Sequence, residues 1–196
     1  MGEEQNQLTK PERLEALRQA IAENPFVTDE ILASRFGVST QTVRLDRLQL
    51  GIPEVRTRTR RVAEGAYRKL RSLRGREIVG NLYELERGLR ALSVLETTPD
   101  MVFEKANVVR GHFMFAQAES LALAVIDAEA ALTGVANIKY KHPVSAGQKL
   151  FAHAEVTRRR QNKYFVAVRT FESNREVFRA KFIIVSLDDG KGAAQS

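Results

Sequence analysis

The chain of 196 residues contains no cysteine. Disulfides, thiolate metal sites and cysteine nucleophiles are therefore excluded, and the absence fits a reducing compartment. Long hydrophobic runs are also missing, because no apolar stretch approaches the roughly 18–20 residues that span a bilayer. The first ten residues, MGEEQNQLTK, lack the apolar region of a signal peptide. We therefore expect a cytoplasmic protein that does not enter a membrane.

Histidine is scarce as well, with three residues in the chain. His112, His142 and His153 are widely separated in the sequence, which argues against a metal site. We expect neither a bound metal nor a cofactor.

The composition nevertheless supports a folded core, since 43% of the residues are hydrophobic and 28% are charged. The length allows one large domain or two small ones. The net charge of +7 is unevenly distributed, because eleven Arg or Lys residues between Arg44 and Arg76 face only three acids, a local charge of +8. Such clustering favours a phosphate backbone as partner. The alternative is a solvated basic helix that keeps the protein soluble.

Three short helices are predicted near the N-terminus. The first has Thr9 as its N-cap and ends at Asn24-Pro25. Thr28 caps the second, whose apolar face contains Ile31, Leu32 and Phe36. Gly37 ends this helix, and Ser39 caps the third, in which Val43 and Leu50 face inward.

The segment Thr28–Leu50 has the pattern of a helix-turn-helix, with small Ala33 where the two helices would cross. Side chains early in its second helix should point outward to read DNA, since Gln can pair with adenine and Arg with guanine. Two arginines after Pro53 could enter a minor groove or contact phosphates loosely. A plain three-helix bundle or a protein-docking module is the alternative. The candidate DNA-binding residues are Ser39, Thr40, Gln41, Arg44, Arg47, Arg56 and Arg58.

A basic amphipathic helix is predicted over Arg56–Leu73, with Val62, Ala66 and Leu70 on its apolar edge. The pattern changes from Glu77 onward, and a helix around Phe113–Ile126 is apolar on nearly every side, so it must be buried. The boundaries that follow are a helix-turn-helix domain at 1–55, a linking helix at 56–76, a second domain at 77–189 and a flexible tail at 190–196.

The second domain combines this buried helix with strands, which predicts an α+β protein. One strand precedes the helix and four follow it, joined mainly by turns. This order describes a curled antiparallel sheet around a central helix. The predicted strands are Leu82–Glu96, Val135–His142, Lys149–Arg160, Lys163–Ser173 and Val177–Leu187.

The segment VRGHFMFAQAESLALAVID resembles the start of the central helix in hot-dog-fold acyl-CoA thioesterases. In that family a glycine-bearing turn precedes the helix, whose N-terminus polarises the thioester carbonyl. The resemblance places Gly111 and His112 on the turn and Glu119 on the family's carboxylate. Arg110 departs from the pattern, because such enzymes often carry histidine there.

Together with VSTQTVRLDRLQLGIPE, this segment makes Pro11–Leu187 similar to the FapR family of bacterial repressors of fatty-acid and phospholipid synthesis genes. The resemblance implies a DeoR-like DNA-binding domain, a linking helix and a hot-dog domain, assembled as a homodimer on a near-palindromic operator of double-stranded DNA. It implies malonyl-CoA or malonyl-acyl carrier protein as effector. Arg110 corresponds to the arginine that pairs with the malonyl carboxylate. Phe103, Gly111 and Leu132 correspond to the acyl tunnel, and Glu119 replaces an amide.

Several roles stay open at this level. Arg110 could instead form a salt bridge with Glu104 or Glu119. Glu119 could activate water, which would give a thioesterase carrying a DNA-binding module, but we favour a carboxylate held by an arginine and a protein that is not an enzyme. The basic run Arg158–Arg160 could meet the phosphates of coenzyme A or form a solvated hairpin end.

Overall fold

The computed structural model describes residues 8–187, and the predicted tail at 190–196 lies outside them. Internal contacts divide the chain into two units, Met1–Val62 and Ala63–Ser196. The boundary between them falls inside one helix, α4. None of the helices within residues 8–187 is both long enough and apolar enough to cross a membrane.

The N-terminal unit contains the three predicted helices, α1 (Lys10–Glu23), α2 (Asp29–Phe36) and α3 (Thr40–Gln49). The predicted starts of α2 and α3 are confirmed, because Thr28 accepts a hydrogen bond from the Ile31 amide and Ser39 accepts one from Thr42. Gly37 ends α2 in the left-handed conformation, with φ at 64°. The helices enclose a small core. Its buried members are Leu17, Ala20, Ile21, Val27, Leu32, Ala33, Phe36 and Val43.

The fourth helix, α4, spans Val55–Tyr67 and is shorter than the predicted Arg56–Leu73. Past Tyr67 the amides of Lys69 and Leu70 bond to carbonyls three residues earlier, so the chain tightens and leaves the helix. The predicted apolar edge is partly right. Ala66 is buried in the core of the C-terminal unit, and Leu70 packs against that core from a turn.

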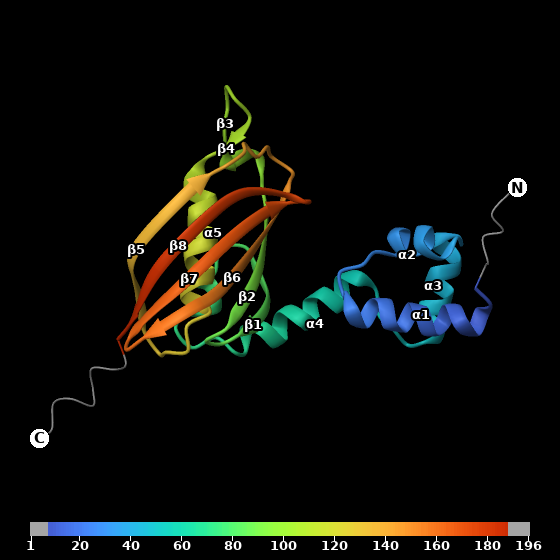
Figure 1. Ribbon diagram of the computed structural model, residues 1–196. Coiled ribbons are helices and arrows are strands. Elements are labelled where there is room, and N and C mark those ends of the chain that lie inside the picture. Colours follow the sequence, from blue (N-terminus) through green and yellow to red (C-terminus); the bar gives the residue numbers. More distant parts are fainter. Residues whose placement is uncertain (1–7, 188–196) are drawn as a thin grey trace, which may run out of the picture. The chain divides into compact units, whose positions relative to one another are not determined.

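The C-terminal unit is an antiparallel sheet of six strands in the order β1-β2-β6-β7-β8-β5, curled around the helix α5, Gly111–Ala124 (Figure 1). This is the geometry of a hot-dog domain, so the predicted fold class is confirmed. A two-stranded hairpin, β3 and β4, precedes α5. The strands are β1 (Asn81–Glu86), β2 (Arg90–Glu96), β3 (Val102–Phe103), β4 (Val108–Val109), β5 (Ala131–Tyr140), β6 (Lys149–Arg160), β7 (Lys163–Glu172) and β8 (Arg175–Ser186).

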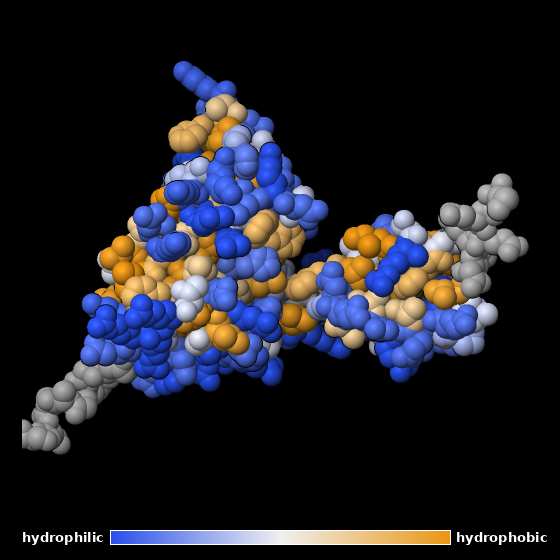
Figure 2. Space-filling model, in the orientation of Figure 1, coloured by the Kyte–Doolittle hydropathy of each residue, from blue (hydrophilic) through white to orange (hydrophobic). Residues whose placement is uncertain are grey.

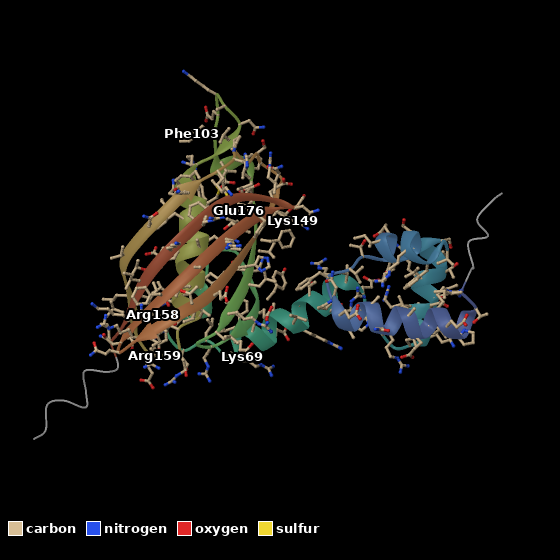
Figure 3. All side chains as sticks on the ribbon, viewed as in Figure 1. Lys69, Phe103, Lys149, Arg158, Arg159 and Glu176 are labelled. Carbon is tan, nitrogen blue, oxygen red and sulfur yellow. The ribbon has the colours of Figure 1, made fainter. Side chains whose placement is uncertain are left out.

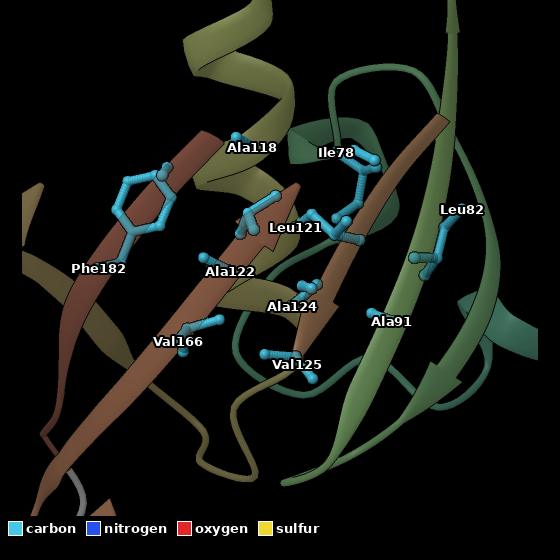
Figure 4. Packing of buried hydrophobic residues seen from close by; sticks show 14 of the residues in the cluster. Ile78, Leu82, Ala91, Ala118, Leu121, Ala122, Ala124, Val125, Val166 and Phe182 are labelled. Atoms are coloured by element: carbon cyan, nitrogen blue, oxygen red, sulfur yellow. The ribbon is translucent and has the colours of Figure 1, made fainter. Parts of the chain in front are cut away.

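The core lies between α5 and the inner face of the sheet (Figure 4). Ala118, Leu121 and Ala122 of α5 are completely buried, and alternate residues of the strands face them, including Val166 and Phe182. Because small alanines line one side of α5, the strands can approach the helix closely.

The predicted strand Leu82–Glu96 is wrong, because a turn divides it into β1 and β2. Gly88 takes a φ of 74° there, and the Leu89 amide bonds to the carbonyl of Glu86. The hairpin of β3 and β4 was not predicted, since strands of two residues leave no alternating pattern.

Candidate functional site

The exposed face of α3 presents most of the predicted DNA-binding side chains. Gln41 and Arg44 are exposed, Thr40 is half-buried, and Ser39 is an exposed N-cap. Arg44 keeps one loose ion pair, with its Nε 3.8 Å from the Asp29 carboxylate. These four residues occupy the first turns of the helix, where its amides carry partial positive charge. Gln41 and Arg44 are therefore accessible to a polyanion, with Ser39 and Thr40 beside them.

Arg47 does not share this face, so the prediction that it points outward is wrong. Its side chain is only 4% exposed. Its Nε and Nη2 donate to the two carboxylate oxygens of Asp29, at 3.2 and 3.1 Å, and its Nη1 donates to the carbonyl of Ile52 at 3.0 Å. A buried guanidinium needs such partners, and here they hold α3 against α2.

Arg58 is also buried, which contradicts its predicted reach toward a minor groove. Its guanidinium donates to the carbonyls of Pro25, Val27 and Pro53, at 3.2, 2.7 and 2.7 Å. Burial lowers the pKa of Arg58 from its ordinary value, with a smaller effect from the charge of Arg47. Arg56, by contrast, is exposed and keeps its predicted freedom.

A hollow of about 410 Å³ lies at the start of α5 in the C-terminal unit. Gly111 and Met114 line it from the helix, Val109 from β4 and Tyr140 from the end of β5, with His142 just beyond. Because α5 begins here, the positive end of its dipole lies at this hollow. The site can therefore accept a carbonyl or a carboxylate.

Arg110 immediately precedes α5 as its N-cap residue. Its Nη2 donates to the carbonyl of Asp100, its Nε donates to that of Met101 at 3.4 Å, and its Cζ lies 5.1 Å from the centre of the Phe113 ring. Within residues 8–187 the suggested salt bridges to Glu104 and Glu119 are absent. The pKa of Asp100 is lowered mainly by a hydrogen bond with the Thr98 side chain, and the charge of Arg110 adds a smaller lowering effect.

The other predicted effector residues are not gathered at one place. His112 follows Arg110 by two positions and is exposed. Phe103 lies on the β3–β4 hairpin, where it is 57% exposed (Figure 3). Leu132 lies near the other end of β5. Tyr140 lies eight positions further along the strand, which corresponds to about 26 Å. One protomer therefore does not bring Leu132 to the hollow.

Glu119 is half-buried on α5, and within the described part of the chain no arginine pairs with it, contrary to our expectation. The completely buried polar side chain of α5 is Gln117. Its Nε2 donates to the carbonyls of Ser93 and Leu150, at 3.3 and 3.1 Å. Gln117 therefore anchors α5 to β2 and β6, a role that sequence reasoning missed.

Sequence reasoning also missed Tyr140. A Cβ on Gly111 would lie 2.7 Å from the Cζ of Tyr140, so only glycine lets this ring approach the start of α5. Tyr140 in turn lies 5.2 Å from the ring of Phe178. The glycine was visible in the sequence, but its neighbour comes from a strand about thirty positions later and left no local signal.

Comparison with known proteins agrees with both halves of the chain. Residues 106–178 match the family model of the thioesterase superfamily. Transcription factor FapR of Caldanaerobacter subterraneus is 57% identical over 182 residues, which cover 93% of this chain and 91% of that protein. Transcription factor FapR of Bacillus subtilis is 44% identical over 176 residues, which cover 88% of this chain and 94% of that protein.

Solved structures resemble a part of this fold. An uncharacterised protein from Pyrococcus horikoshii has a TM-score of 0.54 at 27% identity and covers 58% of this chain and 86% of its own. A sigma28-regulated virulence protein from Campylobacter jejuni has a TM-score of 0.60 at 23% identity and covers 65% of this chain and 92% of its own. This second likeness supports a shared fold and nothing about function.

Proposed function

The chain belongs to the FapR family of transcription factors, and from this we propose that it represses fatty-acid and phospholipid synthesis genes until malonyl-CoA or malonyl-acyl carrier protein releases it from DNA. The observation that carries the proposal is Arg110. It immediately precedes Gly111, which lines the hollow at the start of α5, and its guanidinium donates to two backbone carbonyls rather than forming an ion pair. A sensor of malonyl-CoA needs a cationic group such as this guanidinium to pair with the free carboxylate of the malonyl thioester.

Arg110 explains selectivity for the malonyl group in physical terms. A guanidinium offers paired donors that match a carboxylate, and such charge-assisted hydrogen bonds are about twice as strong as neutral ones. Acetyl-CoA has the same thioester but no free carboxylate, so it leaves the guanidinium with its weaker carbonyl partners. Malonyl-CoA therefore gains binding free energy that acetyl-CoA does not.

A homodimer would complete the effector site. Strand β5 forms one edge of the sheet and exposes Leu132 and Val135. An edge strand pairs readily with a second copy about a two-fold axis. If two β5 strands pair antiparallel, the start of one lies beside the end of the other. The partner's Leu132 then approaches Tyr140 and the hollow.

Release from DNA then requires that malonyl-CoA bind the released arrangement more tightly than the DNA-bound one. Two α3 helices of a dimer enter successive major grooves only when they lie about 34–36 Å apart. A hundredfold difference in effector affinity supplies about 2.7 kcal/mol per site toward an arrangement without that spacing.

Fluorescence anisotropy of a labelled operator tests the proposal. The operator is the duplex that the full-length protein enriches from a random library. Malonyl-CoA should displace wild-type protein, and acetyl-CoA should not. Arg110→Ala should bind DNA normally and resist displacement, while Arg90→Ala, which changes an exposed arginine of β2, should behave as wild type. Equal insensitivity of the wild type to both thioesters would refute malonyl sensing.

A thioesterase is the second candidate, because Glu119 is half-buried on the central helix without an arginine partner and the domain matches the thioesterase superfamily. Its test is the release of free thiol from malonyl-CoA. Steady turnover by the wild type that disappears in Glu119→Gln would support hydrolysis. Absence of turnover at malonyl-CoA concentrations that saturate binding would exclude the thioesterase, and the malonyl sensor would remain as the candidate function.

A further inference from the structure

The recognition helix α3 carries two leucines on its outward face. Val43, Asp46 and Arg47 are buried on one side of α3. Residues Gln41, Leu45 and Leu48 follow one another at spacings of four and three, so they form a stripe on the opposite side. Each member of this stripe is exposed. The centre of the exposed face is therefore partly apolar.

The exposure of these leucines is large, 58% for Leu45 and 67% for Leu48. Hydrophobic surface is visible among the hydrophilic side chains over α2 and α3 (Figure 2). Single exposed leucines are common on proteins. Leu45 and Leu48, however, lie one helical turn apart on a helix whose other exposed residues are polar, so they form a continuous apolar strip. Removing such a strip from water is favourable.

We propose that Leu45 and Leu48 contact the C5-methyl groups of thymines in the major groove. Thymine is the base that presents a methyl group there, and adenine offers the donor and acceptor that an amide such as Gln41 matches. The stripe thus fits A·T base pairs in the major groove. The inference rests on the proposed function, because it takes α3 to be the helix that reads DNA.

The surroundings of the stripe favour DNA over a protein partner. Arg44 is exposed on one flank, and the exposed side chains of α3 include no carboxylate, since Asp46 is buried in an ion pair with Arg13. Arg35 and Arg56 of the same unit are also exposed and positively charged, while exposed Glu30 of α2 interacts with the charge of Arg44. A polyanion with methyl groups on its groove floor complements both the cationic flank and the apolar centre.

Removing only the methyl groups tests the proposal. Full-length protein first enriches a duplex from a random library. That duplex is then made twice, with thymine and with deoxyuridine in the enriched half-sites, and anisotropy measures both affinities for the wild type. We expect about fourfold weaker binding for each contacted methyl that is lost. Leu45→Ala and Leu48→Ala should bind the thymine duplex more weakly and discriminate less between the two duplexes.

The control is Ile31→Ala on α2, which also shortens an exposed aliphatic side chain, 57% exposed. It should keep the full discrimination, and thermal unfolding confirms that each variant is folded. Equal affinity of the wild type for both duplexes, or undiminished discrimination by both leucine variants, would overturn this inference and leave the repressor function intact. Failure to enrich any duplex would instead remove the DNA-binding function, and this inference with it.

Discussion

The Nη2 of Arg47 lies 3.1 Å from the Oδ2 of Asp29, and the same arginine donates to the carbonyl of Ile52. One side chain therefore joins α3, the start of α2 and the segment that follows α3. A second buried pair, Arg13 with Asp46 at 2.7 Å, joins α1 to α3. These two pairs and the small apolar core together hold α3 in its place among the three helices.

Replacing Arg47 by alanine should destabilise the N-terminal unit by about 3 kcal/mol, because it leaves Asp29 buried with only a distant partner. Replacing Arg44 should hardly change stability, since Arg44 is exposed, but it should weaken DNA binding. Urea unfolding followed by circular dichroism measures the first effect, and anisotropy measures the second. An Arg47→Ala protein with wild-type stability would contradict the structural role.

Arg58 and Arg56 form a similar contrast on α4. Arg58→Ala should lower the free energy of unfolding by about 2–3 kcal/mol, because three carbonyls lose a charged donor. Arg56→Ala should leave stability unchanged and reduce the slope of log affinity against log salt by about one, as expected for a lost phosphate contact. Salt titrations of both variants check this, and a reduced slope in a fully stable Arg58→Ala protein would restore its predicted role at DNA.

Gly111→Ala should weaken effector binding more than stability. The added Cβ collides with the ring of Tyr140, but this ring is 49% exposed and can move aside. The displaced ring then alters the hollow that both residues line. Adding Tyr140→Ala should restore part of the affinity that Gly111→Ala loses. Isothermal titration with malonyl-CoA compares the single and double variants, and purely additive losses would show that the two residues act independently.

Glu176 should make stability depend on pH. A hydrogen bond from Arg179 lowers the pKa of Glu176 below its ordinary 4.5, with Lys141 adding a smaller attraction. A lowered folded pKa means stability that is complete above pH 4.5 and is lost as the pH falls through the folded value. Glu176→Gln should therefore cost about 0.5–1 kcal/mol at pH 7 and nothing in strong acid. Thermal unfolding across pH distinguishes this from a constant difference.

The elements that local chemistry specifies were the ones that sequence predicted well. Thr28, Gly37 and Ser39 act through bonds to residues within a few positions, so their roles are visible in the sequence. Alternation likewise located β6, β7 and β8 because each strand is ten or more residues long. The turn at Gly88 escaped prediction, because a single glycine within Leu82–Glu96 does not by itself distinguish a turn from a continuous strand.

The residues that were misplaced depend on distant partners. Arg47 and Arg58 look like surface arginines in the sequence, and only folding brings Asp29 and three carbonyls around them. Leu132 was grouped with Arg110 through a family resemblance, which does not say that the two lie far apart in one protomer. Such errors mark the limit of periodicity, which gives the face of a residue but not its neighbours.

Helix α4 is shared between two cores. Arg58 bonds its first half to loops of the N-terminal unit, whereas Ala66 is buried in the core of the C-terminal unit, and exposed Gly65 separates them. Glycine weakens a helix interior by up to about 1 kcal/mol. Amide hydrogen exchange should therefore divide α4 into two cooperative segments, the first opening with the N-terminal unit and the last turn with the other. A single helix would then report two separate unfolding free energies.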